Sequence, residues 1–172
     1  GGCKKLKTIK GTDTWKIQNA TDLSKMFSQC NSLQDMKGLE DWNVSKVAGF
    51  GSMFQGCSSL TKLDLRNWVT SSATEIGGMF NGCANLEVLR VDNFNTSNVG
   101  NSGGTGMSSM FAGCGKLKTL NLNSFTRGTS LTRITGFLQF CGSLEYFSMQ
   151  NFDFSGITTF QSCIQDCKSL KM

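Results

Sequence analysis

Cysteines and carboxylates are the residues of this sequence that could do chemistry. The 172 residues include eight cysteines and twelve acidic residues but no histidine, so the commonest general base is missing. The carboxylates share no register that would recur as a site. Cys163 and Cys167 form the only close cysteine pair, whereas tetrahedral zinc needs a cluster of ligands. The sequence therefore predicts no enzyme, no metal site and no cofactor.

A glycine-rich stretch, GNSGGTG at Gly100 to Gly106, resembles a phosphate-binding loop by its glycine content alone. It lacks the GxxxxGKS or GxxxxGKT spacing and the lysine that would contact phosphate. We interpret it as a surface insertion between repeats. Removing Gly100 to Gly104 should leave the melting temperature nearly unchanged, because the entropy of a loop changes slowly with its length.

The cysteines recur at a regular interval. Seven of the eight lie 26, 27 or 31 residues apart, namely Cys3, Cys30, Cys57, Cys83, Cys114, Cys141 and Cys167. Their neighbours repeat with them, as in MFSQC from Met26, MFQGC from Met53 and MFNGC from Met79. Cys163 occupies the methionine position of the last copy. Such a period is typical of a solenoid or a propeller.

The apolar spacing inside one repeat distinguishes these two architectures. Apolar residues lie ten, seven, four and three positions before each cysteine, as do Val47, Phe50, Met53 and Phe54 before Cys57. This spacing favours a helix. The LxxLxL pattern after the cysteine is typical of a short strand, as in Leu60, Leu63 and Leu65. Residues placed to cap the helix starts, or to end the helices, are Ser45, Ser71, Thr132, Gly56, Gly82 and Gly113.

The predicted fold class is therefore α/β. We expect a leucine-rich-repeat solenoid of about six repeats of 26–27 residues, with a parallel sheet on the concave face and short helices on the convex face. The array should cover residues 1–172 as a single domain. Because no atypical terminal repeat is present, we expect a segment of a longer surface protein. Strands should start near Leu33, Leu60, Leu86, Leu117 and Leu144 and pair in parallel.

In such a stack each cysteine lies over the previous one, in a buried column. Stacked strands bring Cα atoms within the range that a disulfide tolerates, but their side chains point alongside one another rather than together. We therefore expect the column to hold free thiols that fill space in the core.

Strand residues between the inward leucines should face outward along the sheet and form two columns, at five and seven positions after each cysteine. The second column, which contains Lys10, Lys37 and Arg90, leans basic. The residues that we select as candidate partner contacts are Lys10, Lys37, Lys62, Asp64, Arg90, Asn121, Tyr146 and Ser148.

The repeat MFxGCxxLxxLxLxxF, with NTSNV after Phe94 and NVSKV after Trp42, resembles the repeats of BspA-like bacterial surface proteins. The motif that follows the aromatic residue, NTSNV or NVSKV, is lost at 70–76 and 126–131. The resemblance implies a leucine-rich-repeat fold, an extracellular location, secreted or at the cell surface, and adhesion to host or neighbouring-cell proteins or glycans. We accordingly expect a non-catalytic recognition module, with a structural spacer as the alternative.

Charge and composition limit the other partners. The net charge is +5, with five lysines between Lys4 and Lys16, which would attract acidic proteins, glycans or membrane surfaces weakly or simply keep that end soluble. The aromatic residues mostly occupy framework positions, so the basic surface with interleaved aromatics that nucleic acids favour is not expected. No apolar run is long enough to span a bilayer. We expect a monomer that binds no nucleic acid and inserts into no membrane.

Overall fold

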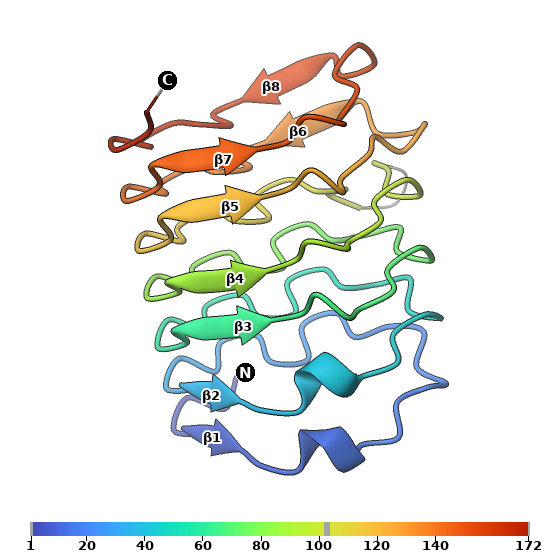
Figure 1. Ribbon diagram of the computed structural model, residues 1–172, viewed down its shortest axis with the longest axis vertical. Helices are drawn as coiled ribbons and strands as arrows, with labels where there is room; N and C mark the ends of the chain where they lie inside the picture. Colours follow the sequence, from blue (N-terminus) through green and yellow to red (C-terminus); the bar gives the residue numbers. More distant parts are fainter. Residues whose placement is uncertain (1, 102–103, 172) are drawn as a thin grey trace.

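The computed structural model describes residues 2–101 and 104–171. Gly1, Ser102, Gly103 and Met172 lie outside the described residues, so the predicted insertion at Gly100 to Gly106 is described only in part. The chain winds into a stack of coils, each coil being one repeat of the sequence. Successive coils follow one another along the long axis of the molecule (Figure 1).

One side of the stack carries short parallel strands, and we call it the strand face. Its strands pair in order as β1 with β2, β3 with β4 and β5 with β7. Their bounds are Thr8–Ile9 for β1, Asp35–Met36 for β2, Lys62–Asp64 for β3, Val88–Arg90 for β4, Thr119–Asn121 for β5 and Tyr146–Ser148 for β7. The predicted parallel pairing is confirmed. From β2 onward each strand begins two residues after the predicted leucine, because that leucine closes a turn back to the cysteine, as Leu60 does with Cys57.

A second parallel ladder runs along the opposite side, which we call the turn face. Here β6, Arg133–Thr135, pairs with β8, Thr159–Gln161. Isolated parallel bridges join Asp22 to Gly49 and Gly49 to Glu75. The bridge residues and the first residues of β6 and β8 all lie eight residues before a repeat cysteine, so the turn face joins neighbouring coils at one repeated position.

The predicted fold class, an α/β leucine-rich-repeat solenoid with helices on a convex face, is wrong. Residues 2–101 and 104–171 contain no α-helix. The helices found there are two single turns of 3-10 helix, η1 at Thr12–Thr14 and η2 at Leu39–Asp41. The strands are two or three residues long and form separate two-stranded sheets instead of one continuous sheet. Turns occupy the turn face where helices were expected.

The backbone hydrogen bonds of the turn face explain why no helix forms. In the coil that ends at Cys57, the N–H groups of Met53, Gln55 and Cys57 each bond to the carbonyl three residues back, at 3.1 Å. The alternate N–H groups of Ser52 and Phe54 instead bond to carbonyls of the next coil, at 2.9 and 2.8 Å. A helix would need every N–H within its own coil, so the inter-coil ladder excludes it.

This alternation needs left-handed backbone at regular positions. Gly56 has φ 73°, and the equivalent Gln29, Phe140 and Asp166 are also left-handed, with φ between 59° and 63°. Glycine adopts this conformation without strain. The glycines predicted to end helices therefore do occupy left-handed positions, but in turns.

The predicted helix caps are wrong for the same reason. Ser45 lies in a turn in which the Oδ1 atom of Asn43 accepts hydrogen bonds from the Ser45 N–H at 3.2 Å and Oγ at 2.7 Å. Asn95 and Ser97 repeat this arrangement at 2.9 and 2.7 Å. These are side-chain-closed turns, which Asn favours because its amide oxygen mimics a backbone carbonyl.

A single hydrophobic core runs through the stack from Leu23 to Phe152. Aromatic rings lie along it in two rows, in which neighbouring rings are stacked except for the T-shaped pair of Phe111 and Phe137. One row consists of Trp15, Trp42, Trp68, Phe94 and Phe125, and the other of Phe27, Phe54, Phe80, Phe111 and Phe137. Trp42 and Trp68 also donate their indole N–H to carbonyls of the preceding coil, each at 2.7 Å. The rings thus add directional contacts to the area that they bury.

The glycine-rich insertion is tied to the coils on both sides. The Oδ1 atom of Asn101 accepts the backbone N–H groups of Thr132 and Arg133 at 2.8 and 2.9 Å. The carboxylate of Glu75, in the preceding coil, accepts Thr105 Oγ1 at 2.9 Å and the Gly106 N–H at 3.0 Å. The insertion is therefore anchored through polar side chains.

Nowhere in residues 2–101 and 104–171 does a helix have the length and apolar character needed to cross a membrane.

Candidate partner-binding surface

The repeat cysteines belong to the core. Cys30, Cys57, Cys83, Cys114 and Cys141 are buried, Cys163 and Cys167 are half-buried, and Cys3 is exposed. All eight are free thiols. The Cys57 thiol donates to the Phe27 carbonyl at 3.1 Å, and Cys83 donates to Phe54 at 3.2 Å. The expected buried column is confirmed for its five central members.

Burial also suppresses the reactivity of these thiols. Desolvation, with a smaller contribution from the neighbouring cysteine, raises the pKa of Cys57 and of Cys141 to about 12. Desolvation, with a smaller contribution from neighbouring cysteines, also raises the pKa of Cys83 and Cys114. Because the thiolate is the nucleophile and the metal ligand, this column is unsuited to catalysis near neutral pH.

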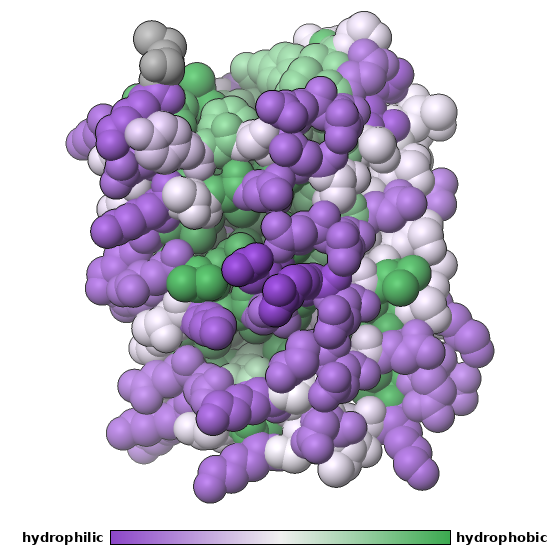
Figure 2. Space-filling model, in the orientation of Figure 1, coloured by the Kyte–Doolittle hydropathy of each residue, from purple (hydrophilic) through white to green (hydrophobic). Residues whose placement is uncertain are grey.

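The eight predicted contact residues all lie on the strand face or immediately after its strands. The strand register places Lys62 beside Val88, Asp64 beside Arg90, and Asn121 beside Ser148. The two predicted columns therefore exist as rows across neighbouring coils. Hydrophilic side chains cover most of the surface in this view (Figure 2).

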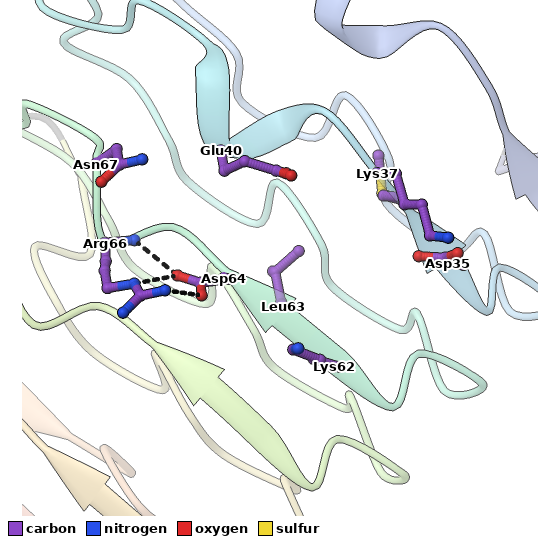
Figure 3. Close-up of a pocket in the computed structure, with 9 residues that line it drawn as sticks. Asp35, Lys37, Glu40, Lys62, Leu63, Asp64, Arg66 and Asn67 are labelled. Carbon is purple, nitrogen blue, oxygen red and sulfur yellow. Dashed lines mark hydrogen bonds and ion pairs between the residues drawn. The ribbon is translucent and has the colours of Figure 1, made fainter.

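Three of the predicted residues meet in one hollow, which we call the central pocket (Figure 3). It has a volume of about 400 Å³ and contains Lys37, Lys62 and Asp64. Its other lining residues are Asp35, Met36, Glu40, Leu63, Arg66 and Asn67. The buried side chains of Met36 and Leu63 contribute its apolar surface, whereas the remaining residues supply charge or an amide.

The charged side chains of the central pocket differ in the contacts that they make within the molecule. Arg66 binds Asp64 through two contacts, Nη2 to Oδ2 at 2.9 Å and Nε to Oδ1 at 3.1 Å. Glu40 accepts the Gly38 N–H at 3.0 Å. In the described part of the chain, neither Lys37 nor Lys62 forms an ion pair within 4 Å. These two ammonium groups are therefore available to a partner.

Two further hollows continue along the strand face. One, of about 480 Å³, brings Lys10 and Lys37 together with acidic residues, namely Asp13, Asp35 and Asp41. The other, of about 320 Å³, joins Arg90 and Asn121 to Glu87 and Asp92. Carboxylates therefore lie with the cations in these three hollows, and the predicted basic character of the second column does not extend to the surface around it.

Tyr146 and Ser148 lie outside these hollows. The Tyr146 ring is 54 % exposed, and the Lys171 ammonium lies 5.1 Å from its centroid. Ser148 Oγ donates to Asn123 Oδ1 at 2.6 Å. Ser148 therefore contributes to contacts between coils.

Sequence reasoning selected Asp64 but missed Arg66 and the other acidic residues of the pockets. Arg66 and Asp92 lie nine positions after a cysteine, where the outward alternation continues past the strand, so a third column would have found them. Glu40 and Asp41 belong to η2. Their position follows from the left-handed Gly38, φ 92°, which redirects this coil and which the leucine spacing does not indicate.

The most apolar hollow lies at the C-terminal end of the stack. It has a volume of about 470 Å³ and is lined by exposed aromatic and aliphatic side chains, including Phe147, Phe154, Phe160 and Ile164. These side chains occupy the positions that a following coil covers elsewhere in the stack. We therefore regard this hollow as the uncovered end of the core.

Comparison with known proteins gives a family and no close relative. Nothing matches among the curated proteins, and no solved structure matches either. One family matches twice, over residues 2–119 and 61–172, and together the two matches include nearly the whole chain. Overlapping matches are expected of a chain whose repeats resemble one another. The chain belongs to the family described as Mycoplasma protein of unknown function, DUF285.

Proposed function

We propose that this chain is a non-catalytic recognition module that binds a protein or glycan partner through its strand face. One observation carries the proposal. Residue types repeat from coil to coil at the framework positions, whereas the outward positions of the strand face vary in size and charge. At five positions after the cysteines the chain has Thr8, Asp35, Lys62, Val88, Thr119 and Tyr146. Side chains needed only for stacking would be of one kind, and five residue types share these six positions.

The location and the class of partner are part of the same proposal. The MFxGCxxLxxLxL repeats resemble those of BspA-like surface proteins, and membership of the DUF285 family agrees with that resemblance. We therefore place the chain outside the cell, secreted or at the cell surface. Its partners would be proteins or glycans of a host or of neighbouring cells.

A structural spacer is the alternative, and a different observation favours it. Several outward side chains are already engaged within the molecule, since Asp64 binds Arg66, Arg90 lies 4.0 Å from Asp92, and Ser148 binds Asn123. Side chains satisfied in this way stabilise the stack without needing a partner. Lys37, Lys62 and Val88 are among the exposed residues that this alternative does not explain.

A binding screen separates the two functions. The immobilised chain is exposed to extracellular matrix proteins and to a glycan array, in parallel with a variant carrying Lys37→Ala, Lys62→Ala and Arg90→Ala. A matched control carries Lys25→Ala, Lys46→Ala and Lys168→Ala, three exposed lysines away from the strand face. A recognition module loses its partner in the first variant and keeps it in the second. Equal binding by both variants, or no partner at all, would favour the spacer.

A further inference from the structure

The central pocket is electrically balanced, although the chain as a whole has a net charge of +5. It contains three cations and three carboxylates. The cations are Lys37, Lys62 and Arg66, and the carboxylates are Asp35, Glu40 and Asp64. A long polyanion would gain from the lysines but would meet the carboxylates at close range, and like charges in contact oppose binding.

The signs alternate along the chain. On β3 and just beyond it, Lys62, Asp64 and Arg66 follow one another at every second position. Side chains two residues apart on a strand point to the same face and are separated by roughly 6.6 Å. Lys62 and Asp64 thus lie side by side on β3, and Arg66, in the turn that follows, folds back onto the Asp64 carboxylate.

The signs also alternate across the strands. Asp64 on β3 pairs in register with Arg90 on β4, and neighbouring strands lie about 4.8 Å apart. Asp35 and Lys37 stand in the same pocket on β2 and just after it. Positive and negative side chains therefore alternate both along and across the strands of this surface, at spacings similar to those within an extended polypeptide.

From this geometry we propose that the central pocket binds an extended polypeptide segment in which acidic and basic side chains alternate at every second residue. The inference rests on the proposed recognition function and names its partner. An extended segment presents residues i and i+2 on one face, with a spacing similar to that between Asp35 and Lys37 and between Lys62 and Asp64. Its acidic side chains would meet Lys37 and Lys62, which have no ion pair in the described part of the chain, and its basic side chain would meet Asp35.

The lining of the pocket favours peptide over sugar. The nine residues that line it include no aromatic side chain, so a sugar ring or a base would find no flat face to stack on. Its apolar surface comes from Met36 and Leu63, which are 5 % and 3 % exposed. Binding there would depend on matched charges, which determine specificity and association rate more than affinity.

The test uses fluorescein-labelled peptides of twelve residues and fluorescence anisotropy at low salt. One peptide repeats Glu-Thr-Lys-Thr, and two others carry only Glu or only Lys at the charged positions, while heparin serves as a polyanion. Each exposed ion pair contributes modestly, so three matched pairs should make the mixed peptide bind about tenfold more tightly than either single-sign peptide. Raising the salt concentration should weaken it.

Two substitutions connect the binding to the pocket. Lys37→Glu and Lys62→Glu should each weaken the mixed peptide several-fold, whereas Lys168→Glu, with the same change of charge at the far end of the stack, should not. All three positions are exposed, and circular dichroism with thermal melting checks that the variants fold.

Tighter binding of heparin or of the all-Glu peptide would overturn the inference, and so would equal binding of all probes or indifference to Lys62→Glu. The proposed function is tested by a separate experiment, the binding screen. A partner from the screen that is lost in the strand-face variant would support recognition even if the mixed peptide does not bind.

Discussion

The thiol column makes a quantitative prediction about cysteine reactivity. An ordinary thiol has a pKa near 8.5, and burial raises that of Cys57 to about 12. At pH 8 this difference lowers the thiolate fraction by roughly a thousandfold. Burial of the sulfur adds a steric barrier to the same reaction. Native protein treated with iodoacetamide should therefore be labelled first at the exposed Cys3, then at the half-buried Cys163 and Cys167, and at Cys57 only after denaturation.

Mass spectrometry of tryptic peptides measures this order directly. Native protein is sampled over time without reductant, and denatured protein serves as the reference for complete labelling. The reasoning would be refuted if Cys57 or Cys83 in native protein reacted as fast as Cys3. It would also be refuted if these residues stayed unlabelled after denaturation, because that result would reveal disulfides between coils.

Three further predictions concern stability. Asn101→Ala removes the acceptor of two backbone N–H groups in the next coil, so urea denaturation should show the free energy of unfolding falling by about 1–2 kcal/mol; an unchanged midpoint would mean that water replaces the amide oxygen at no cost. Trp68→Ala should lower the free energy of unfolding by about 3–5 kcal/mol, because Trp68 is 1 % exposed. Trp68→Phe should lower it by less, since an aromatic ring still stacks on Trp42 and Phe94. Equal losses in the two variants would contradict a stacking role. The pKa of the buried thiols is raised on folding. Their contribution to stability is therefore complete below the unfolded pKa of about 8.5 and falls as the pH rises from there toward 12. A plot of unfolding free energy against pH should fall less steeply above pH ~8.5 in Cys57→Ala than in the parent, and identical slopes would show that this thiol does not contribute.

The repeat spacing predicted the stacking, because one residue type at a constant interval must occupy one constant environment. Cys57 and Cys83 are both fully buried, and the strands after them pair in parallel and in register. The outward columns followed from the same spacing. Their pairing, such as Asp64 with Arg90, could therefore be read from position alone.

The helices were mispredicted because apolar spacing does not separate a helix from a series of turns. Consecutive three-residue turns repeat their inward positions every three residues, and a helix repeats them every 3.6. Over the short span between Val47 and Cys57 the two periods give nearly the same pattern. What decides between them is the partner of every second N–H, and at Ser52 and Phe54 that partner lies in the next coil. A single repeat carries no sign of this contact.

The charge balance of the candidate site was missed for a related reason. Selection by column collected Lys10, Lys37 and Asp64, which share a register, but the other carboxylates near these lysines come from another register and from η1 and η2. A surface built by stacking mixes residues from several positions of several coils. Its net charge is therefore a property of the assembled face, and no single column represents it.

The insertion shows where such a stack can accept extra length. The interval between Cys83 and Cys114 is 31 residues, yet the cysteine thiols on both sides bond in the usual way, Cys83 to Phe54 and Cys114 to Phe80. The extra residues lie between Val99 and Met107, which correspond to Val47 and Phe50 of an earlier coil. Within this segment Asn101 binds the following coil and Thr105 binds Glu75 of the preceding coil. The inter-coil hydrogen bonds of the turn face resume at its end, since the N–H groups of Ile76 and Gly78 bond to the carbonyls of Gly106 and Ser108. Stability should therefore depend on the anchoring side chains far more than on the length of the segment that joins them.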